Sequence, residues 1–392
     1  MYKSIYIFVI SLFAIGVFLV GCKRNHTSNT AIELSTVQKE IIASLPNHLV
    51  IAHRGTTFYA PEESEAAMRW ARNTGADYVE FDLQRTKDGY LIALHDDKLL
   101  RTTDVAAKFP NRKNDPVSTF TYQELLTLDV GSWFNKTYPS RAKNNFEGLD
   151  ILTLEDITQI AEGKRIKREK NGKRIISKNI SGLITTLYEP DPNDNGNRPG
   201  IYVETKVPDL FPHIESDLKF ELERLGWYHI HVNSLKSIQT IPGKVGVANT
   251  PNRVILQTFS KKSLITLQKV FVRTIPTCFL LWRGNDHGDI PDDSLSTFKA
   301  WVMFGQKHGA TIIGPSIAGE PNNYKELLSP QHALTLKNSG LKVHAYSFDS
   351  QEQMLKYSIF VHGMFSNKAN EAMIFYNKGK TNPDMVLKEL GY

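Results

Sequence analysis

Two carboxylates stand two residues apart in a short apolar run of the chain. The run extends from Tyr78 to Leu83, and Glu80 and Asp82 lie inside it. Side chains alternate between the two faces of a β-strand, so Glu80 and Asp82 point the same way and their apolar neighbours point the other way. Two carboxylates on one buried face repel each other unless a cation lies between them. A hard divalent ion is the natural occupant, and two solvated carboxylates on an exposed strand are the alternative.

A histidine follows this carboxylate pair. Asp88-Gly89 separates two apolar runs and predicts a β-hairpin with a two-residue turn. In that register Asp82 lies directly opposite His95, where side chains on one face are about 5 Å apart at the β-carbon. We therefore expect His95 beside the carboxylates, and a shift of the register by one residue would turn it to the other face.

Polar residues with related chemistry end two other apolar runs. His53 and Arg54 follow the run Leu49–Ala52, and Glu204 and Lys206 share one face of a later strand. Glu204 is a candidate third metal ligand, and Lys206 is a candidate contact for an anion. A metal ion and the two cationic side chains can hold the oxygens of a phosphate ester while the two histidines act as base and acid.

The elements that must position these residues follow a repeating order. Apolar runs alternate with helical patterns such as 214–225 and 297–308, and Pro61 is expected to begin the helix after the first run. Eight such units predict an α/β fold, a (β/α)₈ TIM barrel, which brings the C-terminal ends of its strands to one rim. A doubly wound open sheet is the alternative, although no Gly-x-Gly-x-x-Gly follows the first strand. The predicted strands are Leu49–Ala52, Tyr78–Leu83, Ile201–Glu204, Val254–Phe259, Thr277–Trp282, Thr311–Ile313, Leu341–Phe348 and Gly363–Phe365.

The N-terminus has the features of an export signal. Lys3 precedes a short apolar run, Ile5–Val20, which is typical of a signal peptide, with a membrane-spanning anchor as the alternative. Leu19–Cys22, LVGC, resembles the bacterial lipobox, in which the cysteine is lipidated and the chain is cut before it. We expect removal of residues 1–21, a lipid on Cys22, a tether over 22–45 and the barrel over 46–392. The protein would then be exported and held at a membrane of the cell envelope.

Two segments of the sequence do not belong to the eight strand–helix units. Residues 98–148 are rich in turns and aromatic residues and are interpreted as an insertion after the hairpin. Residues 164–200 begin with eight basic residues and one acid up to Lys178 and end in a turn-rich stretch. This segment is interpreted as a basic loop, either simply solvated or in contact with anionic lipid head groups.

Composition narrows the possible functions. The formal charge of +6 over 392 residues is too small and too dispersed to indicate nucleic-acid binding, and zinc-finger and helix-turn-helix signatures are missing. Cys278 lies in an apolar run and is expected to be a small core residue rather than a nucleophile.

Several stretches, in this order, closely resemble the glycerophosphodiester phosphodiesterases, and especially their exported bacterial subgroup. They are HRG at 53–55, PEES at 61–64, GADYVEFDLQRTKDGYLIALHDDKLLRTTD at 75–104 and VETK at 203–206, with shorter matches such as GSWF at 131–134, LQTFS at 256–260 and FSN at 365–367. The resemblance implies a (β/α)₈ barrel that hydrolyses glycerophosphodiesters to sn-glycerol 3-phosphate and an alcohol.

The resemblance also implies roles for the candidate residues. The ligands of one divalent cation, Ca²⁺ or Mg²⁺, would be Glu80, Asp82 and Glu204. His53 would be the base and His95 the acid, and the phosphate contacts would be Arg54 and Lys206. The glycerol hydroxyl of the substrate would attack phosphorus first and give a cyclic phosphate, which water then opens.

The chain departs from the family pattern at a few positions. Glu63 replaces an amide, Tyr346 replaces a tryptophan, and Ser366-Asn367 replaces Thr-Asp. None of these positions is expected to touch the seven candidate site residues, so they are expected to change substrate preference rather than chemistry. Two other functions stay open: a lysophospholipase D-type phosphodiesterase, and a non-catalytic surface lipoprotein that binds a partner.

Overall fold

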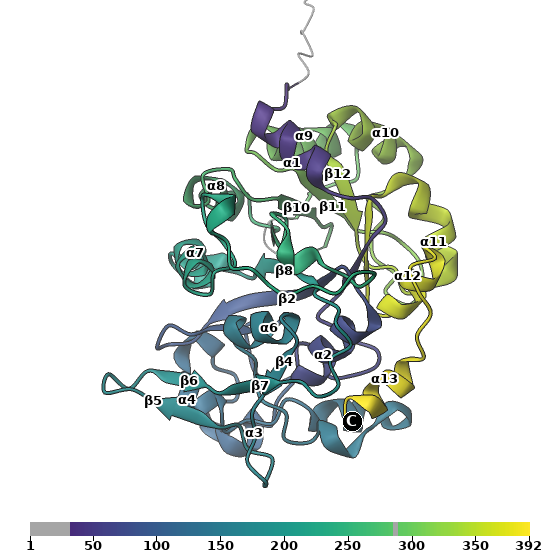
Figure 1. Cartoon of the computed structure of the whole chain (residues 1–392). Coiled ribbons are helices and arrows are strands. Elements are labelled where there is room, and N and C mark those ends of the chain that lie inside the picture. Colours follow the sequence, from purple (N-terminus) through teal and green to yellow (C-terminus); the bar gives the residue numbers. More distant parts are fainter. Residues whose placement is uncertain (1–31, 285–288) are drawn as a thin grey trace, which may run out of the picture. The chain divides into compact units, whose positions relative to one another are not determined.

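Eight parallel strands close into a barrel in the computed structural model, which describes residues 32–284 and 289–392 (Figure 1). The order around the barrel is β1-β13-β12-β11-β10-β9-β8-β2, and β1 pairs with β2 to close it. This closure confirms the barrel and rules out the open sheet. The bounds are β1 Leu49–Ala52, β2 Tyr78–Arg85, β8 Gly200–Thr205, β9 Val254–Thr258, β10 Thr277–Leu281, β11 Ile312–Pro315, β12 Lys342–Ala345 and β13 Gly363–Ser366.

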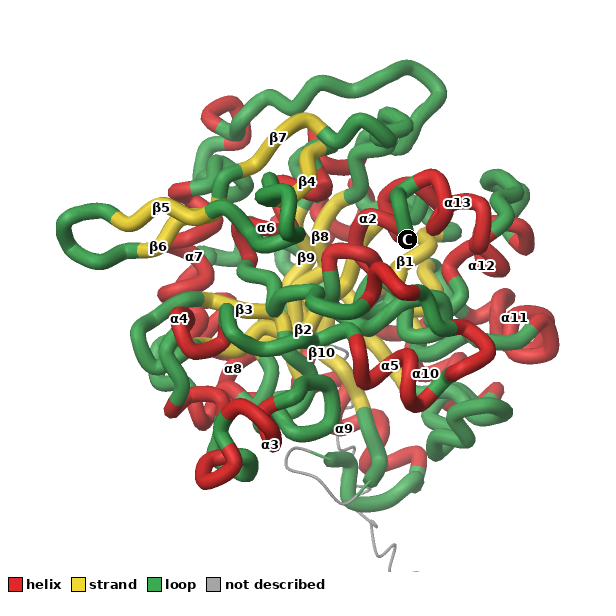
Figure 2. Tube along the Cα trace, turned by 90° about the horizontal axis from the view of Figure 1, so that it is seen from below, coloured by secondary structure: helices red, strands yellow, loops and turns green. Residues whose placement is uncertain are grey.

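Helices surround the strands, and Figure 2 shows the strands gathered at the centre of this arrangement. One helix of the barrel repeat follows each barrel strand, although a long segment separates β2 from its helix. The helices are α2 Glu65–Thr74, α6 Leu154–Ala161, α7 Ile214–Arg224, α8 Lys261–Val270, α9 Leu295–Lys307, α10 Pro330–Ser339, α11 Gln351–Tyr357 and α12 Ala369–Phe375. The helical patterns predicted over 214–225 and 297–308 correspond to α7 and α9.

The first of these helices begins later than the sequence suggested. It starts at Glu65, because the hydroxyl of Ser64 accepts a hydrogen bond from the backbone N–H of Ala67 and so caps it. Glu63 has φ 56°, a left-handed conformation that cannot continue into a right-handed helix. The prediction that Pro61 begins the helix is therefore wrong, and residues 61–63 are free to point towards the barrel rim.

The barrel interior is a packed apolar core. Side chains at alternate positions of each strand fill it, among them Ile51, Tyr78, Tyr202 and Ile255, and Cys278 is fully buried among them as predicted. The residues between them face the helices and join the larger outer core. Side chains of a strand return to the same face every second residue. The next inward-facing residues therefore lie at the C-terminal ends of the strands, where the candidate polar residues also lie.

The segment predicted as an insertion folds into short helices against the barrel. After the short strand β3 (Leu91–Ala93), the chain forms α3 (Val105–Lys108), α4 (Tyr122–Leu125) and α5 (Ser132–Thr137) before it reaches α6. Phe120, Phe134 and Phe146 are fully buried in this segment, and the rings of Phe134 and Phe146 pack edge to face at 5.6 Å. The aromatic composition of residues 98–148 thus builds a small extension of the outer core.

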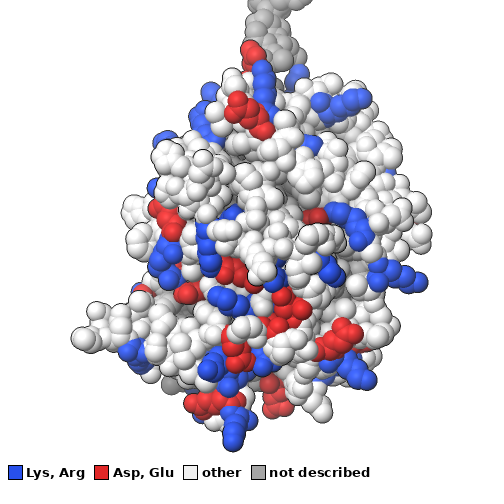
Figure 3. Space-filling view, in the orientation of Figure 1, with Lys and Arg blue, Asp and Glu red and all other residues white. Residues whose placement is uncertain are grey.

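Residues 164–200 are not the loop that their composition indicated. They include two antiparallel ribbons, β4 (Lys164–Ile166) with β7 (Tyr188–Pro190) and β5 (Ile176–Lys178) with β6 (Ile184–Thr186). Several basic residues are structural: Arg174 is buried and pairs with Asp156 at 2.8 Å, and Arg168 pairs with Glu65 at 2.7 Å. Both carboxylates lie outside the basic run, Asp156 on α6 and Glu65 on α2, so a charge count of that run could not reveal these pairs. Figure 3 shows Lys and Arg interspersed with Asp and Glu on the face in view.

The barrel also carries helices near both ends of the described chain. Part of the predicted tether, residues 22–45, is the helix α1 (Thr36–Ser44), whose buried Gln38 donates to the carbonyls of Gln306 and Ala310. The folded unit therefore begins before residue 46. The last helix, α13 (Pro383–Glu389), accepts a hydrogen bond from Trp70 of α2.

The N-terminal predictions fall largely outside the structure. The proposed signal peptide, residues 1–21, and Cys22 lie outside the described residues. Within residues 32–284 and 289–392, every helix is too short or too polar to be a candidate membrane span.

Candidate active site

The strand register brings the candidate acids to one level of the barrel. Asp82 of β2 is the register partner of Glu204 of β8, and Glu204 is in turn the partner of Gln257 of β9. One oxygen from each of Glu80, Asp82 and Glu204 lies within 4.8 Å of the others, and all three side chains are buried. The two carboxylates of β2 therefore do share one inward face, and the third comes from the neighbouring strand.

These acids influence the ionisation of one another. Burial and the negative charge of Asp82 raise the pKa of Glu80 well above its usual range. Burial also raises the pKa of Glu204 to about 7, against the opposing charge of Lys206. Burial disfavours the ionised form of Asp82 too, but nearby positive charges, Lys206 first among them, lower its pKa overall. Without an added cation the three acids are hard to ionise together.

Two basic side chains neutralise part of this charge. The ammonium of Lys206 lies 3.4 Å from Asp82 Oδ1 and 3.2 Å from Glu204 Oε1. Arg54 Nε lies 3.2 Å from Asp82 Oδ2, and the backbone N–H of Arg54 donates to Glu80 Oε2 at 2.8 Å. Arg54 and Lys206 thus contact the acids directly.

The donor set fits a hard divalent cation. The three available groups are all carboxylates, the ligand class that Ca²⁺ and Mg²⁺ prefer. Asp82 Oδ2 is buried and, beyond its ion pair with Arg54 Nε at 3.2 Å, receives no hydrogen bond from the described residues, which leaves a lone pair for an ion. Three carboxylates and two basic side chains also leave an excess of negative charge. Glu80, Asp82 and Glu204 are therefore suited to hold one such ion.

His53 stands at the end of β1, beside the acids. Its Nε2 lies 4.0 Å from Glu80 Oε2, and its Nδ1 lies 2.7 Å from Asn367 Oδ1. Burial and the charge of Arg54 lower the pKa of His53 to about 3, so the ring is neutral at physiological pH. A neutral imidazole with one nitrogen facing the acids can accept a proton there.

His95 reaches the same rim, although its predicted register is wrong. Leu83 pairs with Ala93, so Asp82 lies opposite Leu94 and not opposite His95. The turn has three residues rather than two, and the last of them, Gly89, has φ 95°. A three-residue turn that ends in a left-handed glycine is a common hairpin connection.

The end of β3 explains why His95 still points to the site. The strand ends at Ala93, so the alternation of faces no longer governs the next residues. Gln84 Nε2 donates to the carbonyls of Leu94 and Asp96, both at 2.6 Å, and so fixes the chain beyond the strand. Burial lowers the pKa of His95. The charges of Arg54 and Lys206 also lower this pKa, and the charge of Asp82 raises it, so the ring lies close enough to all three to interact with them.

A charged network above His95 was not predicted from the sequence. His95 Nδ1 lies 2.6 Å from Asp96 Oδ1, and Arg101 from the inserted segment bonds to Asp96 at 2.7 Å and to Glu62 at 2.6 Å. Glu62 also pairs with Arg54 at 3.1 Å. The adjacent HDD sequence, His95 to Asp97, was the local signal for Asp96, whereas Arg101 and Glu62 meet only through the fold.

Other contacts correct the view that the departures from the family pattern lie away from the chemistry. Glu63 Oε1 accepts a hydrogen bond from the backbone N–H of Asp82 at 2.7 Å. Asn367, which replaces an aspartate, contacts His53 directly. The amide of Gln257 donates to Glu80 Oε1 at 2.8 Å. These three residues touch candidate site residues, and sequence reasoning gave them no such role.

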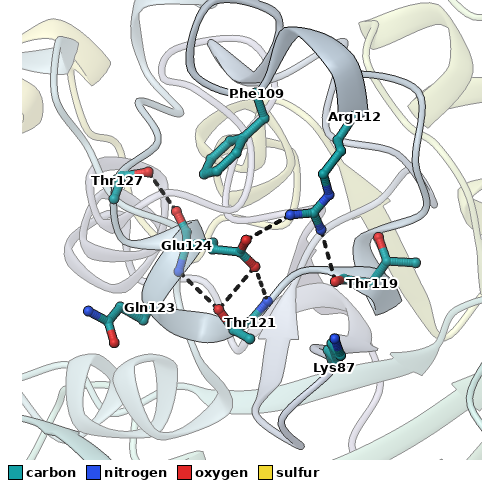
Figure 4. Close-up of a pocket in the computed structure, with 8 residues that line it drawn as sticks. All are labelled: Lys87, Phe109, Arg112, Thr119, Thr121, Gln123, Glu124 and Thr127. Atoms are coloured by element: carbon teal, nitrogen blue, oxygen red, sulfur yellow. Dashed lines mark hydrogen bonds and ion pairs between the residues drawn. The ribbon is translucent and has the colours of Figure 1, made fainter.

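A surface pocket lies elsewhere, in the inserted segment (Figure 4). Its volume is about 680 Å³, and its lining comes from Lys87 and from residues 109–127. Its main polar groups bond to one another: Arg112 pairs with Glu124 at 2.7 Å, and Glu124 and Thr121 cap α4 reciprocally. The pocket is therefore a feature of the insertion and not of the barrel rim.

Comparison with known proteins agrees with this geometry. Residues 53–178 match the sequence profile of the Glycerophosphoryl diester phosphodiesterase family. The glycerophosphodiester phosphodiesterase of Bacillus subtilis is 28% identical over 335 residues, which cover 85% of this chain and 88% of that protein. The enzyme of the same name from Haemophilus influenzae is 30% identical over 65% of this chain and 58% of its own length.

The solved structures that resemble this one share the fold. An Oleispira antarctica phosphodiesterase, in complex with the product sn-glycerol-3-phosphate, superposes with a TM-score of 0.53 at 20% identity, over 84% of this chain and 96% of that one. The chain is therefore similar to the Glycerophosphoryl diester phosphodiesterase family over residues 53–178, and to a relative named glycerophosphodiester phosphodiesterase over most of its length.

Proposed function

We propose that this protein is a metal-dependent glycerophosphodiester phosphodiesterase that releases sn-glycerol 3-phosphate and an alcohol. The observation that carries the proposal is the buried cluster of Glu80, Asp82 and Glu204 with two histidines and two basic side chains at one rim. The relatives named above are glycerophosphodiester phosphodiesterases, and the Oleispira antarctica protein binds sn-glycerol-3-phosphate as its product.

The proposed mechanism divides the work among the residues of the rim. Glu80, Asp82 and Glu204 would hold one Ca²⁺ or Mg²⁺, which when bound supplies charge stabilisation for the phosphoryl oxygens. Arg54 and Lys206 already contact two of these acids and would share the phosphoryl oxygens with the ion. They are basic at any physiological pH: although burial opposes their charge, the surrounding carboxylates raise the pKa of both.

The two histidines would move protons in two successive steps. In the first, His95 starts protonated, with its Nδ1–H held by Asp96. His53 Nε2 takes the proton of the glycerol 2-hydroxyl, whose oxygen attacks phosphorus, while the bond from phosphorus to the alcohol oxygen breaks and His95 gives its proton to that oxygen. The product is a five-membered cyclic phosphate. In the second, His95 takes a proton from water, which attacks phosphorus, and His53 returns its proton to the 2-oxygen. Both histidines end in their starting states.

A substrate comparison tests the proposal against the lysophospholipase D alternative. Purified protein with Mg²⁺ or Ca²⁺ should release choline from glycerophosphocholine and do so much faster than from lysophosphatidylcholine, because the described rim is built around charged and hydrogen-bonding groups. Equal or faster release from the acylated substrate would favour the alternative. Absence of turnover with either substrate and either ion would favour a binding protein that lacks catalysis.

We also propose that the protein is exported and anchored to a membrane of the cell envelope through a lipid on Cys22. The proposal is supported by the apolar run that ends in Leu19–Cys22. A lipid anchor would place the enzyme near the membranes whose deacylated phospholipids supply glycerophosphodiesters.

A further inference from the structure

His53 has an uncharged partner, unlike the second histidine of the site. Its Nδ1 lies 2.7 Å from the amide oxygen of Asn367. His95 Nδ1, by contrast, lies 2.6 Å from a carboxylate oxygen of Asp96. An amide can either donate or accept, so its orientation decides which hydrogen the histidine carries. The residues that orient the amide of Asn367 therefore determine the state of His53.

Asp349 orients this amide. The carboxylate of Asp349 accepts hydrogen bonds from the backbone N–H of Asn367 at 2.8 Å and from Asn367 Nδ2 at 2.7 Å. Asn322 Nδ2 donates to the same carboxylate at 2.6 Å. Asp349 is buried, and burial raises its pKa while these three N–H donors act in the opposite direction. With three donors aimed at it, Asp349 serves as an acceptor, so the NH₂ group of Asn367 must face it.

The tautomer of His53 follows from this orientation. With the NH₂ group of Asn367 directed to Asp349, the amide oxygen is the atom that faces His53. An oxygen can only accept, so Nδ1 of His53 carries the hydrogen and Nε2 carries the lone pair. Nε2 is the nitrogen that lies 4.0 Å from Glu80 Oε2, on the side of the metal-binding acids.

We propose that Asn367, oriented by Asp349, is a positioning residue that fixes His53 as the Nδ1–H tautomer with Nε2 free to act as a base. The tautomer of the neutral ring follows from the contacts, and only the base role rests on the proposed function. The backbone carbonyl of Asn367 also accepts a hydrogen bond from Thr56 at 2.6 Å, which ties the loop to the HRG turn. Orientation and position are thus fixed by separate contacts.

The same contacts explain why an amide stands here. An aspartate at position 367 would place a second carboxylate beside Asp349, at a distance now occupied by a 2.7 Å hydrogen bond. Two carboxylates at that separation cannot both be ionised without a large cost. A carboxyl group at position 367 would have to hold a proton, whereas the amide carries its own fixed donor and acceptor.

Nitrogen-15 NMR of the histidine side chains tests the tautomer directly, on purified protein loaded with Mg²⁺. In the wild type, His53 should show a protonated Nδ1 and an unprotonated Nε2. Asn367→Ala removes the acceptor, and Asp349→Asn allows the amide to turn, so both variants should show a mixture that includes the Nε2–H tautomer. Thr56→Val is the matched control, because it removes a contact to the same loop and should leave the Nδ1–H tautomer in place.

Kinetics and metal binding separate this role from a merely structural one. Asn367→Ala should lower kcat for glycerophosphocholine by about 10²-fold, since misplaced catalytic groups cost about that much, while KM and Mg²⁺ affinity stay within about twofold. A wild-type spectrum that shows hydrogen on Nε2 of His53, or variants with an unchanged tautomer, would overturn the proposal. The wild-type spectrum remains a test even if a variant fails to fold. The predicted tautomer in a protein without turnover would refute the proposed function alone.

Discussion

Replacement of His95 by alanine should slow the reaction by a factor that depends on the leaving group of the substrate. For glycerophosphocholine, whose choline alkoxide leaves poorly, loss of a general acid should lower kcat by about 10²–10⁴-fold. At 1.36 kcal/mol for each factor of ten, this is about 3–5 kcal/mol of transition-state stabilisation. The upper half of that range is expected, because Asp96 at 2.6 Å and Arg101 behind it hold the ring in one orientation.

The substitution should leave the fold intact. The His95 side chain is 29% exposed and lies beyond the end of β3, so its removal leaves no cavity in the packed core. The free energy of unfolding should therefore change by about 1 kcal/mol or less. A thermal melt of the variant beside the wild type checks this before the kinetics are compared.

The assay compares two substrates in two variants. A nitrophenyl ester of glycerol phosphate has a leaving group that barely needs an acid, so His95→Ala should regain most of the wild-type rate on it. His53→Ala lacks the base for the attacking hydroxyl and should stay slow on both substrates. Equal rescue of both variants, or rescue of His53→Ala alone, would refute the assignment of roles. The double variant should be little worse than the slower single variant, since groups that act as one unit are not additive.

Three further outcomes are expected, two from the structure and one from the sequence. Glu204→Gln should weaken Mg²⁺ or Ca²⁺ binding at least about tenfold by calorimetry, and EDTA should lower the wild-type Tm, because an ion bound only by the folded state stabilises it. Asp191→Asn should destabilise the protein by about 3–5 kcal/mol, since it leaves the buried Arg69 and Arg72 without their shared carboxylate. Burial opposes the ionisation of Asp191, but these guanidinium groups lower its pKa to about 2. The contribution of Asp191 to the free energy of unfolding is therefore complete above about pH 4 and is lost as the pH falls towards 2. The difference in denaturant midpoint between variant and wild type should shrink over that range. Mass spectrometry of membrane-extracted protein should show a lipid on Cys22 and no residues before it, and an intact Met1 would contradict the anchor.

Local patterns predicted the barrel and its carboxylates because both depend on the two-residue period of a strand. Glu80 and Asp82 had to share a face once their strand was recognised, and Glu204 met them because parallel strands end at one rim. The hairpin register differs from the predicted one by one residue, because Asp88-Gly89 indicated two turn residues and the chain uses three. His95 still reaches the site, as predicted, because Gln84 holds the chain beyond the end of β3.

Contacts between distant segments account for what the sequence could not show. Asn367 meets His53 across 314 positions of sequence, and Arg101 meets Glu62 across 39. The basic residues of 164–178 looked like a solvated run, although Arg174 is a buried ion-pair partner of Asp156. No periodicity or short motif encodes such pairs, since they arise only when separate loops are brought to the same place by the barrel.

The central claim is that the acids and histidines of this rim cleave a glycerophosphodiester on the alcohol side of phosphorus. Phosphorus-31 NMR of glycerophosphocholine incubated with the purified protein tests it in one experiment, with and without EDTA and with Glu80→Gln as the matched variant. The signal of the diester should be replaced by that of sn-glycerol 3-phosphate, and both EDTA and Glu80→Gln should stop the change. Formation of phosphocholine, or an unchanged rate in EDTA and in Glu80→Gln, would contradict the account.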